Sequence, residues 1–305
     1  LILIDTAQGL PQYIPSLKEA LSTYSSPHVT DIILTHWHQD HIGGLSSVLE
    51  LCAGMKMSPP PRVWKYKGEE KDDERVEEIL GEVPEERFRR SGDGGNEWFW
   101  RLSEGQVFQA DIDVDQTTTL QIIHTPGHTL DSICLFSSSP SPSAPSILFT
   151  ADTVLGHGTA VFEDLGAYMS SLRVCLDKMG EVKGEVELFP GHGEIVVDGR
   201  AKIEEYLRHR VMREEQVLKG LRESSGGERE MTASSLTEKI YANTIPESLI
   251  PAATRGIILH LEKLEKEGQV DRISIPTSSL EGNTEVLLGW NDGWRLVPAF
   301  TGGKM

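Results

Sequence analysis

The chain has 305 residues, of which 38% are hydrophobic and 25% charged, and this is the composition of a folded protein with one large or two modest domains. Its 47 acidic and 29 basic residues give a net charge of −18, which disfavours general nucleic-acid binding because phosphates are repelled, although a local basic patch leaves that interaction open. Because the chain has no run of about 18 apolar residues and its three cysteines are scattered, we expect no membrane span, no disulfide framework and a cytoplasmic location.

The first part of the chain alternates between strand and helix patterns. Residues 1–4 are an apolar run that predicts a strand ending at Asp5. Apolar positions at helical spacing predict a helix over residues 10–24. Residues 32–34 predict a buried strand, and residues 45–51 begin the next helix. This alternation favours an α/β architecture in which helices cover sheets.

The loop after the strand at residues 32–34 is dense in side chains that bind metals. Within six residues it contains four of them: His36, His38, Asp40 and His41. Imidazole and carboxylate groups are the ligands of zinc-class ions. A strand end is a rigid support, and a loop lets several side chains turn toward one point. The pattern predicts a metal site, and incidental histidines in a polar loop are the alternative.

Residues 59–105 depart from the alternating pattern. They contain a proline run, the charged stretch 69–75 and the glycine-rich stretch 91–95. We therefore expect an elaborated insertion that is partly mobile. Its aromatic cluster, residues 98–100, is predicted either to pack in a core or to line a substrate cleft.

Three later strands repeat the arrangement of an apolar strand followed by a candidate ligand. The predicted strands and the residues that follow them are 120–123 with His128, 146–149 with Asp152, and 186–189 with His192. A single histidine after a strand more often makes a hydrogen bond or caps an element. Four such strand ends in one chain favour a shared metal centre. The low-complexity stretch 137–146 predicts a flexible connection between two strands.

Two helical segments follow these loops. The glycine-rich loop after Asp152 contains His157, which we predict to position substrate or transfer a proton, with a structural hydrogen bond as the alternative. Residues 168–179 predict a core helix, and residues 201–223 predict a long one. The long helix carries a basic patch: Arg208, Arg210 and Arg213. Such patches are usually solvated and internally paired, and binding of an anionic group is the other interpretation.

The C-terminal part, residues 228–305, predicts a small winged-helix-like unit after a Ser/Gly linker at residues 224–227. Its predicted elements are two helices and two strands: 233–241, 251–267, 270–273 and 286–290. The second helix is rich in glutamate, which disfavours DNA reading and favours a docking or lid role.

The series His-x-His-x-Asp-His, followed by His128, Asp152 and His192, resembles the metallo-β-lactamase superfamily, and its order and spacing are specific. The absence of cysteine from this set resembles the two-metal glyoxalase II-type branch. The resemblance implies a four-layer αββα sandwich over residues 1–223, with the winged-helix-like unit behind it. It also implies that strands of the fold are missing before residue 1, and that Asp5 is a buried hydrogen-bonding aspartate.

The resemblance further implies two zinc ions, with manganese or iron as other candidates. One ion would be held by His36, His38 and His128, and the other by Asp40, His41 and His192, with Asp152 bridging both. The implied chemistry is hydrolysis by a hydroxide held between the two metals. Asp40 and His157 are the predicted catalytic residues, since Asp40 can also orient the hydroxide or carry a proton.

Residues 156–159, 162–165 and 190–193 resemble more narrowly the β-lactamase-like protein 2 group, which includes fungal hydrolases of polyketide pathways. Some members release aromatic chains from a carrier-protein thioester, and others cleave single-stranded RNA. The chain departs from that group at Ser132, where a histidine is common. We expect a hydrolase of thioester or ester bonds in a small-molecule or carrier-bound acyl substrate. A single-strand endoribonuclease and a non-catalytic metal-binding scaffold are the alternatives, and the oligomeric state is open.

Overall fold

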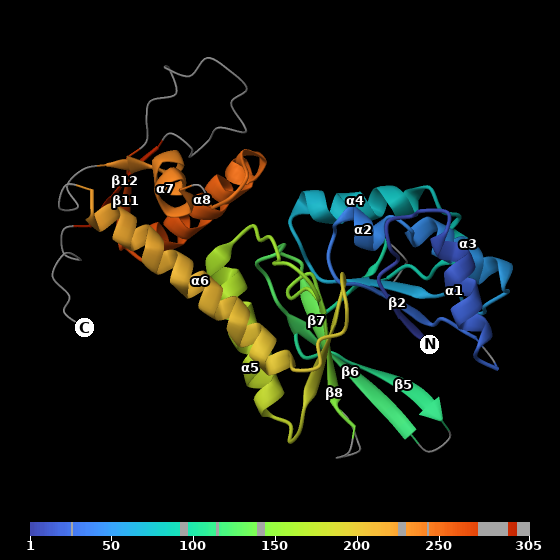
Figure 1. The fold of residues 1–305 in the computed structure, drawn as a ribbon. Coiled ribbons are helices and arrows are strands. Elements are labelled where there is room, and N and C mark those ends of the chain that lie inside the picture. Colours follow the sequence, from blue (N-terminus) through green and yellow to red (C-terminus); the bar gives the residue numbers. More distant parts are fainter. Residues whose placement is uncertain are drawn as a thin grey trace. The chain divides into compact units, whose positions relative to one another are not determined.

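The computed structural model describes residues 1–25, 27–91, 97–113, 116–138, 144–224, 230–242, 244–273 and 292–297. These residues form two compact units (Figure 1). Unit 1 comprises Leu1–Glu163 and Ala167–Glu204, and unit 2 comprises Asp164–Gly166 and Glu205–Met305. No helix among the described residues is long and apolar enough to cross a membrane. The predictions for residues 91–95, 137–146, 224–227 and 286–290 fall wholly or partly outside the described residues.

The first sheet of unit 1 is parallel, with the strand order β1-β2-β3-β4. Its strands are β1 (Ile2–Ile4), β2 (Asp31–Leu34), β3 (Arg62–Lys65) and β4 (Trp100–Arg101). Its helices are α1 (Tyr13–Ser22), α3 (Leu45–Gly54) and α4 (Glu70–Gly81), with the short turns α2 (Gln39–Ile42) and η1 (Glu85–Arg87). Apolar side chains of α1, α3 and α4 pack on one face of this sheet and form a core with it.

The segment predicted as an insertion, residues 59–105, is instead largely part of this layer. β3 lies between β2 and β4, where Val63 pairs with Ile32. Val76 and Leu80 of α4 are fully buried in the core. The charged outer face of α4 conceals its narrow apolar stripe, and β3 is too short to give a clear strand pattern. The aromatic cluster packs in the core, since Phe99 is 2% exposed and Trp100 contacts Trp64.

The second sheet has the order β5-β6-β7-β8-β9. Its strands are β5 (Val107–Asp113), β6 (Gln116–His124), β7 (Ile133–Ser137), β8 (Ser146–Ala151) and β9 (Val186–Pro190). The pairings are antiparallel except for β8 with β9, so β6, β8 and β9 run in the same direction. Helix α5 (Leu165–Gly180) covers the outer face, where Lys178 lies over the ring of Phe136. A second core, with Ile33 and Leu135, fills the space between the sheets, which completes the predicted αββα layers.

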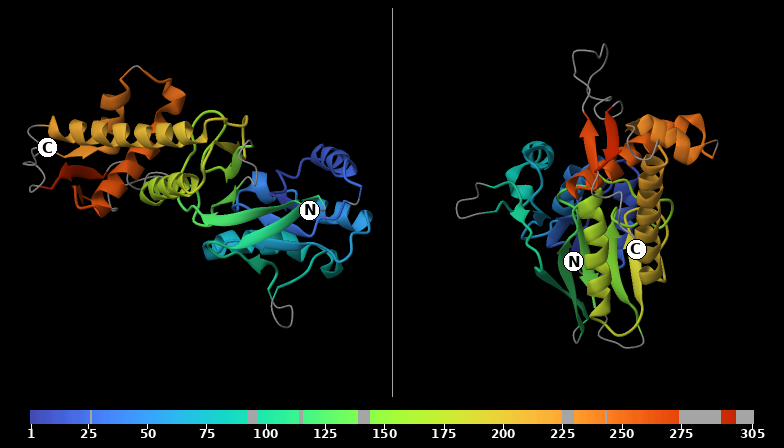
Figure 2. Two further views of the ribbon diagram at one scale, coloured as in Figure 1. Left: turned by 90° about the horizontal axis from the view of Figure 1, so that it is seen from below. Right: turned by 90° about the vertical axis from the view of Figure 1, so that its left-hand side faces the viewer.

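Unit 2 has the two helices and small sheet of a winged helix, as predicted (Figure 2). Its elements are α6 (Gly199–Arg222, which begins in unit 1), β10 (Met231–Thr232), α7 (Ala233–Tyr241), η3 (Glu247–Leu249), α8 (Ile250–Lys266), β11 (Val270–Ile273) and β12 (Gly293–Leu296). The sheet is antiparallel, with the order β10-β12-β11. Trp294 is fully buried in a separate core with Leu236 and Leu261.

Candidate metal centre

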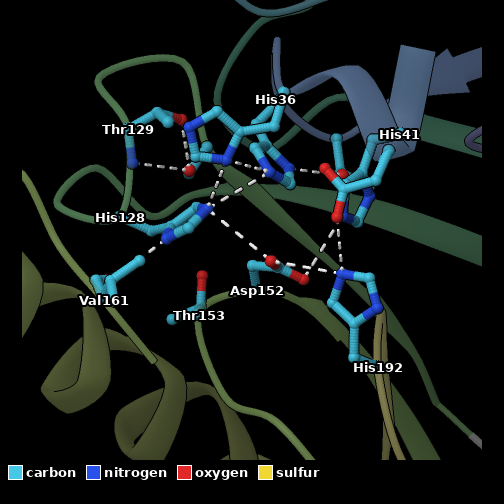
Figure 3. Close-up of polar contacts among 12 residues, drawn as sticks. His36, His41, His128, Thr129, Asp152, Thr153, Val161 and His192 are labelled. Carbon is cyan, nitrogen blue, oxygen red and sulfur yellow. Dashed lines mark hydrogen bonds and ion pairs between the residues drawn. The ribbon is translucent and has the colours of Figure 1, made fainter. Parts of the chain in front are cut away.

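All seven predicted ligands come together at the ends of four strands (Figure 3). β2 leads into the loop that contains His36, His38, Asp40 and His41. In the second sheet, the C-terminal ends of β6, β8 and β9 lead to His128, Asp152 and His192. Among the described residues, three groups have ligand atoms within 4.8 Å of one another: His36/His38/His128, His36/His41/Asp152 and Asp40/His41/His192. The convergence comes from residues far apart in the sequence.

The first group is a triangle of imidazole nitrogens. Nε2 of His36 lies 3.1 Å from Nδ1 of His38. Nε2 of His128 lies 3.2 Å from Nε2 of His36 and 3.0 Å from Nδ1 of His38. Zinc–nitrogen bonds of about 2.0–2.1 Å in a tetrahedron separate ligand nitrogens by about 3.3 Å. The triangle therefore has the spacing of three ligands to one metal ion.

The second group adds carboxylates. Oδ2 of Asp40 lies 3.0 Å from Nε2 of His192, and Oδ1 of Asp152 lies 3.4 Å from Nε2 of His41. The other oxygen of Asp152, Oδ2, is 3.5 Å from Nε2 of His192 and 3.7 Å from Nε2 of His128. Asp152 therefore faces both groups, which is the position of a bridging ligand.

Hydrogen bonds on the far side of the rings orient two of these histidines. Nδ1 of His41 donates to Oδ2 of Asp5 at 2.7 Å. Asp5 also accepts from the backbone N–H and the hydroxyl of Thr35, both at 2.7 Å. Because the single hydroxyl hydrogen of Thr35 goes to Asp5, the contact of 3.1 Å to Nδ1 of His36 requires the imidazole to donate. Both rings then turn the lone pair of Nε2 toward the centre.

The loop of His128 is held by close backbone packing. Nδ1 of His128 donates to the carbonyl of Val161 at 2.9 Å, which also leaves its Nε2 free for a metal. Gly127 has a φ of 135°, and a Cβ placed on it would come within 2.3 Å of Cα of Tyr168. A glycine is therefore required where this loop meets α5. Ser171 of α5 donates to the carbonyl of Pro126.

The charges of the site suit metal binding. Burial, together with neighbouring imidazoles, holds the pKa of His36 well below its usual value, and burial also lowers the pKa of His128, so both rings are neutral ligands. Burial opposes a charge on His41, but its contacts with Asp152 and Asp5 outweigh this and raise its pKa to about 10. Without a metal, a proton on His41 therefore balances Asp152, and a metal ion bound here would displace it.

Two buried atoms test whether these residues fit metal ions. Nε2 of His41 and Oδ1 of Asp152 have no hydrogen-bond partner among the described residues. Buried polar atoms normally have partners, and these two face each other at 3.4 Å, within the group His36/His41/Asp152. Nitrogen and oxygen donors at these spacings are ligands for divalent ions of the zinc class. The residues present therefore fit the metals that the sequence predicts.

The predicted catalytic residue His157 lies at the edge of this centre. It is exposed, on the loop after β8. A Cβ built on Gly193 would lie 2.6 Å from its Nδ1, so its ring sits against the residue next to His192. The backbone N–H of Gly156 donates to the carbonyl of His192 at 2.9 Å, which ties the two loops together. This position, beside the metal groups, keeps His157 as a candidate catalytic residue.

Sequence reasoning missed several residues that shape the site. Thr35 and the carbonyl of Val161 orient ligand rings, and the only signal for Thr35 was a hydroxyl next to a candidate ligand. A Cβ on Gly191 would lie 2.6 Å from Oδ1 of Asp152 and 2.8 Å from Cε1 of His41, so this glycine makes room for both. Ser132, where the sequence departs from its group, is buried and accepts from the N–H of Thr129.

A two-sheet sandwich with histidines and aspartates at its strand ends defines a class of metal-binding hydrolases. A family model described as metallo-beta-lactamase superfamily matches residues 1–192, and the chain belongs to this superfamily. Its fold implies the binding of divalent metal ions, and the histidine and aspartate groups described above are able to hold them. A second model, described as beta-lactamase associated winged helix domain, matches residues 232–277. The predicted family and fold class are confirmed.

Relatives with curated names support the narrower resemblance as well. The beta-lactamase-like protein 2 homolog of Drosophila melanogaster is 34% identical over 271 residues, which are 88% of this chain and 80% of that protein. The atrochrysone carboxyl ACP thioesterase of Aspergillus chevalieri is 31% identical over 251 residues, which are 81% of this chain and 66% of that protein. A beta-lactamase domain protein from Burkholderia ambifaria has the same fold, with a TM-score of 0.67, 16% identity and coverage of 97% of this chain and 82% of that one.

Proposed function

We propose that this chain is a hydrolase with two zinc ions that cleaves a thioester or ester bond of an acyl substrate in polyketide biosynthesis. The convergence of seven nitrogen and oxygen ligands in two groups that share Asp152 carries the metal-dependent part of this proposal. Two zinc ions bound here would acidify water enough to give hydroxide at neutral pH and would polarise a substrate carbonyl. The cytoplasmic location stays a prediction, as do the domain boundaries at residues 223 and 228.

The chain's own residues have distinct roles in this proposal. His36, His38 and His128 would hold one ion, and Asp40, His41 and His192 would hold the other, with Asp152 shared between the two groups. The Asp40 side chain is 43% exposed, so Oδ1 or Oδ2 can accept a proton from the water nucleophile and pass it to solvent. His157 stands beside His192 and is placed to orient the leaving group.

The acyl substrate is supported by relatives and by charge. A relative that is 31% identical is named atrochrysone carboxyl ACP thioesterase. Unit 1 contains 31 of the 47 acidic residues and only 16 of the 29 basic ones, so the unit with the metal groups is strongly negative. Negative charge at the catalytic unit disfavours an RNA substrate, because every nucleotide brings a phosphate.

Parallel assays on one preparation test the proposal. Zinc-loaded protein is given an aromatic acyl thioester in one assay and single-stranded RNA in the other. We expect thioester turnover and no RNA cleavage. Asp152→Ala removes the shared carboxylate, so turnover should fall by at least about a thousandfold. Asp177→Ala, on the exposed face of α5, is the matched control and should retain wild-type turnover.

Each other outcome has a definite meaning. RNA cleavage without thioester turnover would replace the acyl substrate with the endoribonuclease alternative. Purified protein that binds less than one metal ion per chain, measured by elemental analysis, would contradict the metal-dependent mechanism. Metal-bound protein that is inactive on both substrates, and is equally inactive after Asp152→Ala, would favour the scaffold alternative.

A further inference from the structure

A fully buried lysine lies within the support of the metal loops. Lys65 ends β3, and its side chain is 0% exposed. Its ammonium group donates to Oδ1 of Asp73 at 2.9 Å and to the carbonyl of Tyr66 at 3.2 Å, and it forms an ion pair with Oδ2 of Asp131 at 2.8 Å. A charge this deep is tolerated only when opposite charges and hydrogen-bond acceptors surround it. The site is therefore built around the lysine.

Asp131 connects the lysine to the loop of a predicted metal ligand. The Asp131 side chain is also 0% exposed, and its Oδ1 accepts from the hydroxyl of Thr129 at 2.7 Å. Thr129 directly follows His128, and its backbone N–H donates to the hydroxyl oxygen of Ser132 at 3.1 Å. Ser132 in turn lies 2.7 Å from the Thr129 hydroxyl. This chain of contacts runs from β3 to the residue next to His128 without a break.

The segment before α4 lies close to Asp131. A Cβ added to Gly68 would lie 3.1 Å from Cβ of Asp131 and 2.8 Å from Oδ2 of Asp72, so only a glycine fits here without displacing these side chains. Asp73 of α4 also accepts from Arg101 at 2.7 Å, which fixes the second partner of the lysine. The lysine is thus held on one side by α4 and β4, and on the other side it holds the His128 loop.

We propose that Lys65 is a positioning residue of the metal centre, which acts through Asp131 to hold His128 in its place in the first metal group. The inference rests on the proposed metal-dependent function. Lys65 itself touches neither metal group. Its loss should weaken the ion held by His36, His38 and His128, while the ion held by Asp40, His41 and His192 keeps its affinity.

Zinc-binding measurements on metal-free protein test this role without any substrate. Competition with a chromophoric chelator gives the affinity of each ion. Lys65→Met is made in two backgrounds: His192→Ala, in which the first group remains intact, and His128→Ala, in which the second does. We expect Lys65→Met to weaken zinc binding about tenfold to a hundredfold in the first background and to leave it unchanged in the second. Lys71→Met, at a lysine that is 63% exposed, is the matched control and should change neither.

A second variant guards against failure of Lys65→Met to fold. That change alone leaves the Asp131 carboxylate buried and unpaired, whereas Lys65→Met with Asp131→Asn removes both charges and keeps an acceptor for Thr129. The pair should fold and still show the weakened first ion. Equal zinc affinity in both backgrounds, for the single or the paired variant, would overturn the positioning role. Wild-type protein that binds no zinc would instead contradict the proposed function.

Discussion

At the scale of single residues, hydrogen bonds on the far side of three of the five histidine rings decide which nitrogen faces the centre of the site. His41 donates to Asp5, His128 to a backbone carbonyl and His36 to the Thr35 hydroxyl. The family resemblance supplied the ligands and Asp5 in advance, because their order along the chain is specific. It could not supply Thr35 or the Val161 carbonyl, since a hydroxyl or a peptide group has no distinctive sequence pattern.

Asp5→Asn tests how much the hydrogen bond between His41 and Asp5 contributes to zinc affinity. The amide keeps the shape and an acceptor for His41, but it removes the negative charge that makes the imidazole a stronger ligand. We expect zinc affinity of the second ion to fall about tenfold to a hundredfold, measured by chelator competition. Asp177→Asn changes the net charge equally at an exposed position and should have no effect. An affinity equal to that of the wild type would show that the charge of Asp5 is dispensable.

His260 gives a prediction for the dependence of stability on pH. It is 2% exposed, and burial, followed by repulsion from Arg210, Arg213 and Lys263, lowers its pKa to about 3. In the unfolded chain the pKa is about 6.5, so below that pH only the unfolded state takes up the proton. His260 should therefore cost no stability above pH 6.5, and up to about 1.4 kcal/mol per pH unit as the pH falls toward 3.

The matching variant is His260→Leu, which removes the ionisable group and keeps an apolar side chain in the core of unit 2. We expect its free energy of unfolding, relative to that of the wild type, to rise by about 1.2 kcal/mol when the pH is lowered from 7 to 5.5. Urea unfolding at both pH values, followed by circular dichroism, measures the difference. The same difference at both values would mean that His260 is not kept neutral.

At the scale of secondary-structure elements, one glycine inside α8 and one just after it have opposite conformational requirements. Gly256 lies inside the helix, and a Cβ built on it meets nothing within 4 Å. Gly268 follows the helix with a φ of 70°, and its N–H donates to the carbonyl of Glu265 at 2.9 Å. Gly256 only increases the conformational entropy of the unfolded chain. Gly268 adopts a left-handed backbone conformation that residues with a Cβ rarely adopt.

Alanine at these two positions should therefore act in opposite directions. Gly256→Ala should raise the free energy of unfolding of unit 2 by about 0.5–1 kcal/mol. Gly268→Ala should lower it by about 1 kcal/mol. Urea midpoints of the full-length variants measure both, and two shifts of the same sign would contradict the assignment of the helix end at residue 266.

Some secondary-structure elements were predicted correctly from the sequence, and others were missed. Residues 233–241 predicted α7 with its observed bounds, because a clear apolar period lies between a capping threonine and the end of the helix. β3 and α4 were missed, since four residues of strand and a helix with two fully buried apolar residues give little periodic signal. The contact between Lys65 and Asp131 was not predictable, because it joins positions 66 residues apart whose sequence context is ordinary.

At the scale of the whole molecule, the net negative charge is concentrated in unit 1, where 31 acidic residues face only 16 basic ones. This concentration should select among substrates of similar shape. With a neutral and an anionic aromatic acyl thioester, we expect kcat/KM at low salt to be higher for the neutral one. Raising the ionic strength to about 0.5 M should increase kcat/KM for the anionic substrate and leave the neutral one unchanged, because screening shortens the range of the repulsion. A higher kcat/KM for the anionic substrate at low salt would contradict this prediction.

The seven metal-binding side chains extend from residue 36 to residue 192 and belong to both sheets of the sandwich. A folding intermediate with only the N-terminal sheet has four of them, and one with only the second sheet has three. Neither can complete the triangle of His36, His38 and His128, so the free energy of ion binding is gained only when the two halves have joined. Ions bound here would therefore stabilise only the fully assembled sandwich, and a chain that retained them would have completed its folding.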